Sequence, residues 1–327
     1  MADALKERLI KHLTDVHSIE EQALQQMQVA PRLARDPVLA GAFREHLIET
    51  QEQERLVRSR LDALEADPSK IKDLAARAGG VGMVLFARSQ PDTPGKLVSH
   101  AYSYEHMELA AYELLSIVAE RAGDQDTVAV ARSIAEQEAA MAERLAAGFD
   151  RAVEASLREV ARRDLGNQLG RYLADVHAIE AQAVQLLEQG QAIAGDPDLQ
   201  KVFTEHLEET RAQQAAVQAR LYGRGERPSR FKDVLLRVGG LNLSAFFGAQ
   251  PDTPAKLAGF AFAFEHLEIA AYEQLTRVAR RAGDDETARV AQRIAGEERA
   301  AAASIRSRFE PAMQAALRQQ GIGAPAG

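Results

Sequence analysis

Apolar residues recur every three or four positions along most of this chain, which is the spacing expected of amphipathic α-helices. In the first half of the sequence these apolar stripes predict four long helices. The stripes run from Leu9 to Met27, from Leu39 to Leu64, from Leu97 to Val118 and from Val128 to Phe149. Because strands would instead show alternation of period two, the pattern favours an all-α fold.

Turn residues divide the stripes into separate helices. Asp36-Pro37 reads as an N-cap followed by proline at the first helical position, and Thr93-Pro94 opens the third helix in a similar way. Asp67-Pro68 ends the second helix, and Gly123-Asp124 separates the third from the fourth. Two short turns with a longer excursion between the second and third helices are typical of a four-helix bundle.

The long excursion contains weaker signals of its own. A short helical segment is expected at Lys70–Arg77, and it should stop at Gly79-Gly80, since glycine favours a helix end or a loop. The paired glycines recur as Gly239-Gly240 but lack the flanking strand that a dinucleotide site requires.

Several motifs of the first half return in the second half at a constant distance. They are Asp15–Glu20 with Asp175–Glu180, Glu45–Leu47 with Glu205–Leu207, Gln90–Pro94 with Gln250–Pro254, and Glu105–Glu108 with Glu265–Glu268. Each pair is 160 residues apart (175 minus 15, for example). A period this long indicates a duplicated domain rather than a solenoid of short repeats.

The duplication predicts the domain organisation. We expect one four-helix unit at 1–158, a second at 159–320, and a disordered tail at 321–327. The segment 150–166 is itself helical in pattern, so a nearly continuous helix is expected to join the two units.

Acidic residues interrupt the apolar stripes. Glu20 lies four residues from both Val16 and Leu24, which places it on the face predicted to be buried. Three other glutamates have similar positions on the other helices. They are Glu49, with His46 and Gln53 on the same face; Glu108, with Glu105 one turn earlier; and Glu138.

The four glutamates are also level with one another. Glu20 and Glu49 are about equally far from the turn near residue 35, and Glu108 and Glu138 are about equally far from the turn near residue 123. At about 1.5 Å per residue, each lies roughly 21–23 Å from its turn. If the two hairpins pack side by side, one glutamate from each helix reaches the middle of the bundle.

The second copy retains this inner set of polar residues. Its members are Glu180, His206, Glu209, Gln213, Glu265, Glu268 and Glu298. Neighbouring acids on other faces are lost, since Glu21, Glu52 and Glu136 correspond to Ala181, Ala212 and Gly296.

Buried carboxylates gathered at one place repel one another unless they are protonated, paired with a basic side chain or bound to a metal. No Lys or Arg occupies the neighbouring stripe positions. Inward carboxylates from all four helices are used in di-iron and di-manganese bundles. We therefore predict a dinuclear iron or manganese site in each copy, with partly solvated acids as the alternative. The predicted metal residues are Glu20, His46, Glu49, Gln53, Glu105, Glu108 and Glu138, and Glu180, His206, Glu209, Gln213, Glu265, Glu268 and Glu298.

The histidines and Gln53 leave several roles open. His46 is a ligand, a hydrogen-bond donor that orients Glu49, or a core histidine bonded to backbone, and His17 has the same alternatives. His106 is one residue off the glutamate face, which favours a supporting role. Gln53 is either a ligand or a hydrogen-bond partner of one. Tyr104 and Tyr112 read as packing residues, and no catalytic residue is assigned.

Composition narrows the chemistry further. The chain of 327 residues has no Cys, which excludes thiolate sites, and its net charge of −8 argues against nucleic-acid binding and favours attraction of metal cations. No apolar run approaches the length of a membrane span, and the N-terminus has no signal-peptide pattern, so a cytoplasmic protein is expected.

These motifs resemble one family. The runs Asp15 to Gln22, His46 to Gln53 and Glu105 to Tyr112, together with Glu138, are similar to the YciE/YciF-like branch of the ferritin-like superfamily, and the run from Glu105 returns at Glu265–Tyr272. The resemblance covers both copies. It implies two ferritin-like bundles of up-down-down-up topology, a dinuclear iron or manganese site in each, a role in stress response, and an internal pseudo-dimer, with a homo-oligomer as a further alternative.

The sequence departs from the better understood relatives in one respect. Ferritins and rubrerythrins typically carry Glu-x-x-His on the second helix, whereas Glu52 and Ala212 stand three residues after Glu49 and Glu209 here. Metal or peroxide handling, with an oxidase- or peroxidase-type activity left open, is therefore one functional hypothesis. The other is a non-catalytic helical scaffold or stress-associated interaction protein without metal.

Overall fold

The computed structural model describes residues 2–66, 93–226 and 252–322, and in these residues the regular structure is helical throughout. The chain divides into two compact units, Met1–Ser156 and Leu157–Gly321, hereafter unit 1 and unit 2. The predicted all-α fold is confirmed. No helix in the described part of the chain is both long and apolar enough to cross a membrane.

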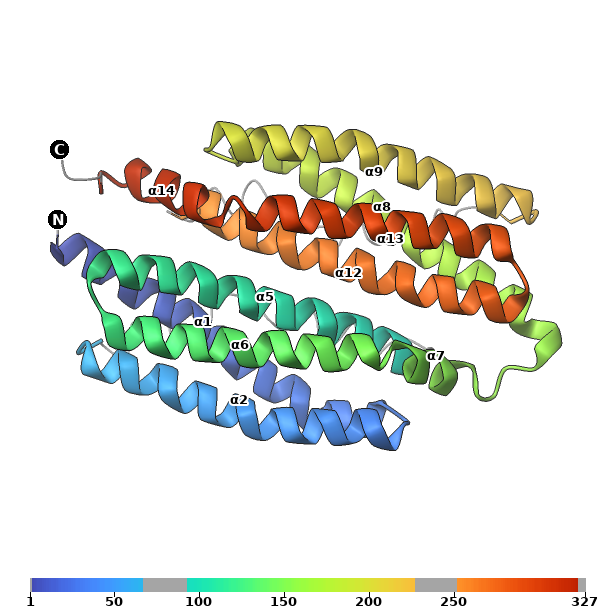
Figure 1. Ribbon diagram of the computed structural model, residues 1–327, viewed down its shortest axis with the longest axis horizontal. Helices are drawn as coiled ribbons and strands as arrows, with labels where there is room; N and C mark the ends of the chain where they lie inside the picture. Colours follow the sequence, from blue (N-terminus) through green and yellow to red (C-terminus); the bar gives the residue numbers. More distant parts are fainter. Residues whose placement is uncertain (1, 67–92, 227–251, 323–327) are drawn as a thin grey trace. The chain divides into compact units, whose positions relative to one another are not determined.

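In its described residues, 2–66 and 93–156, unit 1 is a bundle of four long helices. They are α1 (Ala2–Leu33), α2 (Pro37–Ala63), α5 (Thr93–Ala122) and α6 (Gln125–Ala147), followed by the short α7 (Phe149–Leu157). The hairpins α1–α2 and α5–α6 pack against each other through α1 on α5 and α2 on α6. Arg60, near the end of α2, lies 2.9 Å from Asp124 just before α6, so these two helices are antiparallel. Figure 1 shows α1 and α6 running one way and α2 and α5 the other.

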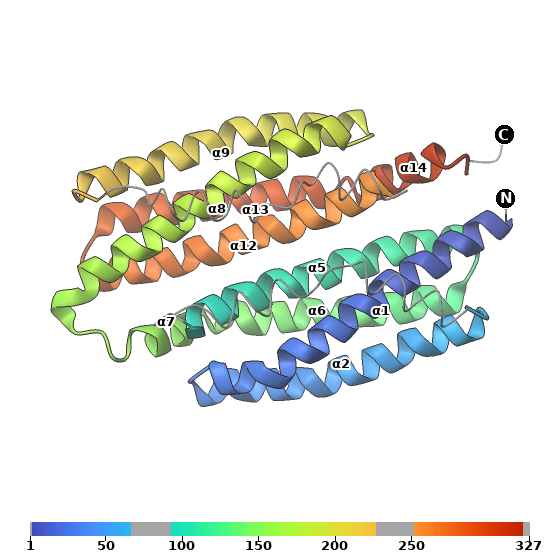
Figure 2. The ribbon, with the colours of Figure 1, turned by 180° about the vertical axis from the view of Figure 1, so that it is seen from behind.

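Unit 2 repeats the arrangement. A 3₁₀ turn, η1 (Arg162–Asp164), precedes α8 (Leu165–Ile193), α9 (Pro197–Gly223), α12 (Thr253–Ala282) and α13 (Asp285–Arg306), and α14 (Phe309–Gln319) follows. The pairs α8–α9, α12–α13, α8–α12 and α9–α13 are in contact, and α14 packs on α12 (Figure 2). Each contact of the first bundle thus has its counterpart in the second.

Aspartates at the helix starts explain why the chain turns where the sequence indicates. The Asp36 side chain accepts hydrogen bonds from the backbone N–H groups of Val38 and Leu39, and Asp196 accepts one from Leu199. These bonds satisfy amide donors that a helix cannot pair within its own first turn. The helix starts predicted at Pro37, Thr93 and after Gly123-Asp124 are all confirmed.

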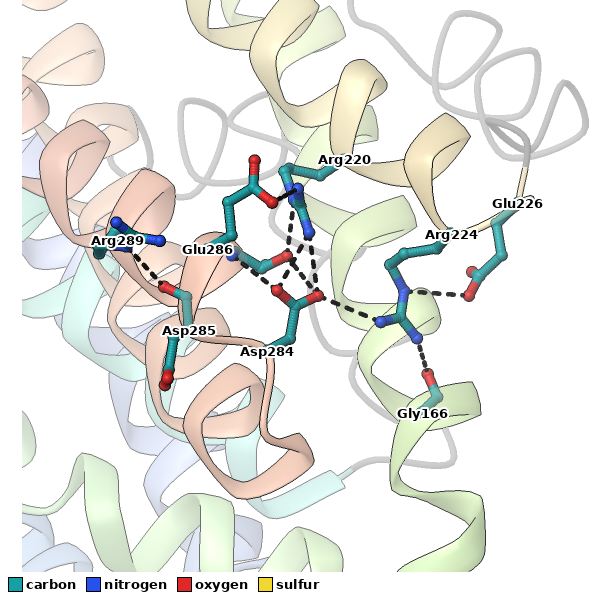
Figure 3. A network of polar contacts seen from close by, with 9 residues as sticks. Gly166, Arg220, Arg224, Glu226, Asp284, Asp285, Glu286 and Arg289 are labelled. Atoms are coloured by element: carbon teal, nitrogen blue, oxygen red, sulfur yellow. Dashed lines mark hydrogen bonds and ion pairs between the residues drawn. The ribbon is translucent and has the colours of Figure 1, made fainter.

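An ion-pair network holds one end of unit 2 together (Figure 3). Asp284 caps α13 by accepting from the N–H of Thr287 at 2.9 Å, and it also pairs with Arg220 of α9 at 3.1 Å. Arg224 lies 3.2 Å from Asp284 and donates to the Gly166 carbonyl of α8 at 2.8 Å. The network therefore connects three of the four long helices. The Asp284 carboxylate both caps α13 and forms ion pairs with the two arginines.

The connection between the units differs from the expected continuous helix. Helical structure stops at Leu157 and resumes at Arg162–Asp164 and Leu165, with Ala161 in an extended conformation. Residues 161–164 are exposed. A segment without an apolar face to bury gains little from staying helical, since most helix stability in proteins comes from tertiary packing.

Some expectations fall outside the described residues. These are the short helix at Lys70–Arg77, the glycine pairs Gly79-Gly80 and Gly239-Gly240, and the tail from residue 323 onward.

Candidate metal centre

The interior of each bundle contains several buried ionisable side chains. In unit 1 the side chains of Glu20, His46, Glu105, Glu108 and Glu138 are buried, with at most 1% of each residue exposed. They come from all four long helices. The three-residue step between Glu105 and Glu108 places both on the inner face of α5, as the spacing predicted.

Four of these residues meet at one point. His46, Glu105, Glu108 and Glu138 each offer one ligand atom, and these atoms all lie within 4.8 Å of one another. His46 Nε2 is 3.1 Å from Glu105 Oε2 and 3.5 Å from Glu138 Oε2. We call this group the unit 1 cluster.

The equivalent residues of unit 2 form the same constellation. His206, Glu265, Glu268 and Glu298 also offer ligand atoms within 4.8 Å of one another, and we call them the unit 2 cluster. His206 Nε2 lies 2.9 Å from Glu265 Oε2 and 3.3 Å from Glu298 Oε2. The repeat has thus preserved a three-dimensional arrangement as well as a motif.

Further polar side chains hold the carboxylates in place. Gln53 of α2 donates from Nε2 to Glu138 and, at 3.0 Å, to Gln137 Oε1. Tyr112 of α5 donates its hydroxyl proton to Glu20 of α1. Unit 2 repeats the second contact, between Tyr272 and Glu180, but its Gln213 donates to Glu297 at 3.1 Å instead. Gln53 therefore lies beside the cluster as a hydrogen-bond donor.

Glu49 does not lie where the sequence placed it. Its side chain is 33% exposed, and it contacts His46 Nδ1 at 3.0 Å and Arg144 of α6 at 3.0 Å rather than the interior. The buried face of α2 passes through His46, Thr50 and Gln53, and Glu49 is roughly a quarter turn from its centre. The inward position predicted for Glu49 is wrong. The α2 side chains that lie at the site are those of His46 and Gln53. The same holds for Glu209, which is 62% exposed beside His206 Nδ1 at 3.2 Å.

Burial and mutual repulsion disfavour the ionised form of several of the buried carboxyl groups. Burial is the largest cause that raises the pKa of Glu20 to about 8, and burial raises the pKa of Glu108 and of Glu138 well above the ordinary value. The neighbouring glutamates add to each shift. In unit 2 the pKa of Glu180 is raised to about 8, and those of Glu268 and Glu298 are raised well above the ordinary value, again mainly by burial.

The pKa values of the two cluster imidazoles are raised as well, although burial alone would lower them. Burial by itself lowers the pKa of His46, but the Glu105 carboxylate outweighs it, and the net pKa rises to about 9. For His206 burial is likewise outweighed by Glu265 and Glu298, and the pKa rises to about 12. A metal ion that binds there competes with the protons that these raised pKa values favour.

Many carboxylate oxygens of the clusters make no hydrogen bond to a described residue, although those of Glu105, Glu138 and Glu298 include one oxygen within ion-pair distance of a cluster imidazole. In unit 1 the buried carboxylate oxygens without a hydrogen bond are Oε2 of Glu20, both of Glu105, both of Glu108 and Oε2 of Glu138. In unit 2 they are Oε2 of Glu180, both of Glu268 and both of Glu298. Buried polar atoms are almost always hydrogen-bonded in native proteins, so this many unbonded carboxylate oxygens at one place fit a site that could hold a metal ion.

His17 and His106 make other contacts. His17 Nε2 is 3.0 Å from Glu54 Oε1, and His106 Nδ1 is 2.7 Å from the Tyr102 carbonyl oxygen. Sequence reasoning missed two partners of the site. Tyr112 was read as a packing residue, although its return as Tyr272 when Tyr104 becomes Phe264 was a usable signal. The sequence gives no indication of a contact between Arg144 and Glu49, because Arg144 reaches Glu49 from a different helix.

Residues 4–158 and 165–318 each match one protein family, Domain of unknown function (DUF892). No solved structure was found to match the chain.

Proposed function

Because the chain belongs to the DUF892 family, with its domain present twice, we propose that it is a ferritin-like metal-binding protein with a dinuclear iron or manganese site in each unit. The resemblance to the YciE/YciF-like branch supports this proposal, and so does the helix order of each bundle. The observation that carries it is the set of buried carboxylate oxygens without hydrogen-bond partners in the clusters.

The donor set fits such a metal. Carboxylate oxygens and one imidazole nitrogen suit iron and manganese, and Zn²⁺-thiolate chemistry is excluded by the absence of Cys. His46, Glu105, Glu108 and Glu138 would hold the ions in unit 1, with Glu20 as a further ligand, and their counterparts would do so in unit 2. When bound, such ions would supply redox chemistry, either by reacting with dioxygen or peroxide or by being oxidised themselves.

The chain's own residues prepare the site for a cation. Glu49 holds the Nδ1 edge of His46, which leaves Nε2 directed at the cluster. Gln53 and Tyr112 fix one oxygen each of Glu138 and Glu20. The histidine of α2, His46, stands three positions before Glu49. In the better understood relatives the histidine stands three positions after the glutamate.

Metal-dependent stability tests the proposal. Thermal melting of metal-free protein should shift upward when Mn(II), or Fe(II) without oxygen, is added, because a ligand that binds the folded state stabilises it, by about 2.7 kcal/mol at 100 times Kd. Glu108→Gln together with Glu268→Gln should abolish the shift. Glu143→Gln, an exposed change on α6, should leave it intact.

The raised carboxyl pKa values favour a second candidate, a scaffold whose clusters stay protonated. In that case metal leaves the melting temperature unchanged, and replacing Glu108 and Glu268 by Gln preserves or raises it without any metal dependence. If neither metal changes the melting temperature, the metal-binding proposal is wrong and the scaffold function is favoured.

A further inference from the structure

The surroundings of the two clusters differ at one charged position. In unit 1, Arg144 of α6 donates to both oxygens of Glu49, at 3.2 and 3.0 Å. The residue 160 positions later is Ser304, so unit 2 has no arginine at this place. The comparison matters because Glu49 and Glu209 are the carboxylates that touch the cluster imidazoles from outside.

In unit 1 these contacts form a chain that leads outward. His46 contacts Glu105 on its inner edge and Glu49 on its outer edge, and Arg144 closes the chain at the surface with 36% of its side chain exposed. Arg144 is also 3.7 Å from Glu45. Arg144 therefore lies between two carboxylates, Glu49 toward the cluster and the more exposed Glu45.

In unit 2 the same side ends in a carboxylate. Glu209 is 62% exposed, and in the described part of the chain no lysine or arginine pairs with it. Glu205, the counterpart of Glu45, pairs with Lys201 of its own helix at 3.7 Å. An approaching divalent cation thus meets an unneutralised negative charge one contact away from His206.

A second acid in each unit is paired with an arginine of its own helix. In unit 1, Glu54 pairs with Arg58, both on α2, and in unit 2, Glu297 pairs with Arg293, both on α13. Position 54 corresponds to Gln214, and position 297 to Gln137, so the acid and its arginine have moved together from one helix to another. This exchange preserves the charge of these pairs, and Arg144 remains the difference at the carboxylate that contacts the cluster imidazole.

We propose that the two metal centres load in order, with unit 2 taking up a divalent cation first and unit 1 held back by Arg144. This inference rests on the proposed function. An exposed carboxylate attracts a cation toward the cluster, whereas in unit 1 the guanidinium cancels that attraction. Glu209 also polarises His206 without competition, while Glu49 is shared between His46 and Arg144, which weakens its support of the imidazole as a donor.

The test measures each centre alone in the full chain. Glu108→Gln with Glu138→Gln disables unit 1, and Glu268→Gln with Glu298→Gln disables unit 2. The probe is Co(II), whose visible absorption changes when protein ligands replace water, followed by stopped flow at low salt. We expect the chain that retains unit 2 to load roughly threefold to tenfold faster.

Exchanging the residue types at positions 144 and 304 should reverse the difference in loading rate between the two units. Arg144→Ser in the chain that retains unit 1 should accelerate loading by about that factor, and Ser304→Arg in the chain that retains unit 2 should slow it. Both effects should shrink in high salt, since they act between charges near the surface. Arg151→Ser removes the same charge from α7, where Arg151 pairs with Asp36 at 3.6 Å, and should leave the rate unchanged.

The outcomes separate the two claims. If both chains bind Co(II) at equal rates, or if Arg144→Ser changes nothing, ordered loading is wrong and the metal-binding proposal stands. If neither chain binds Co(II), both claims are wrong.

Discussion

Tyr112 shows how one side chain stabilises a carboxyl group in the bundle interior. Its hydroxyl donates to Glu20, and neither residue is exposed. Without the hydroxyl, a buried acceptor would lose its only hydrogen bond, and leaving such a group unsatisfied costs more than the bond itself contributes. The return of this pair as Tyr272 and Glu180 indicates that it belongs to the site rather than to general packing.

Tyr112→Phe should therefore lower the free energy of unfolding of the metal-free protein by about 1–3 kcal/mol, measured by urea denaturation. Tyr104→Phe is the matched control. Its hydroxyl donates to the Ile19 carbonyl oxygen at 2.9 Å, and the second copy already has Phe264 at this position. If both variants lose equal stability, Tyr112 has no special role in holding Glu20.

The protonation of the clusters makes the stability of the metal-free protein depend on pH. The folded state keeps the proton of Glu20 up to about pH 8, and that of His46 up to about pH 9, whereas the unfolded chain releases them near 4.5 and 6.5. The folded state thus binds more protons across this window, so the free energy of unfolding should fall as pH rises from about 5 to 9.

Urea midpoints between pH 5 and 9 check this trend. Protein loaded with Mn(II) should show a weaker decline, because the metal replaces the protons. A metal-free protein that gains stability from pH 5 to 8 would show that the cluster carboxyl groups are ionised and solvated.

At the residue scale the sequence identified most of the interior acids and missed the charges at their edge. Glu20, Glu108 and Glu138 could be predicted because each replaces an apolar residue in a 3.6-residue stripe. Glu49 could not be predicted. The apolar stripe of α2 is wide, and the sequence does not decide whether a residue at the edge of the stripe is buried or exposed. Arg144 lies on α6, and a contact between helices is not visible in the period of either one.

At the scale of the helices, the hairpin turns set the level of every ligand. Asp36 and Asp124 fix where α2 and α6 begin, and the inner residues follow at fixed distances along each helix. This is why counting residues from the turns correctly placed Glu108 and Glu138 in the cluster, and Glu20 in the buried interior. The break between Leu157 and Arg162 was not predictable in the same way, because its residues have good helix propensity and lack only a surface to pack against.

Two glycines of unit 2 should respond to alanine in opposite directions. Gly283 ends α12 with φ at +73°, a conformation that costs an alanine about 1 kcal/mol, so Gly283→Ala should lower stability. Gly296 lies exposed within α13 with nothing within 4 Å of an added Cβ, so Gly296→Ala should raise stability by about 0.5–1 kcal/mol. Chemical denaturation of both variants measures the signs, and equal signs would contradict the helix assignments.

At the scale of the whole molecule, the duplication provides an internal comparison. Positions 160 apart preserve the cluster residues, the tyrosine that holds Glu20 or Glu180, and the arginine and aspartate that link α2 to α6 and α9 to α13. They differ at Arg144 and Ser304, outside the clusters. The repeat and its period were readable from the sequence, and the different exposure of Glu49 and Glu209 required the three-dimensional structure.

The metal content of the purified chain, measured by elemental analysis after loading with Fe(II) or Mn(II) and removal of free ions, tests the central claim most directly. Two ions in each unit give about four per chain. The count should fall to about two when Glu108→Gln and Glu138→Gln disable unit 1, and to about zero when unit 2 is disabled as well. A wild-type chain that retains no metal, or variants that retain as much as the wild type, would contradict the assignment of these clusters as metal centres.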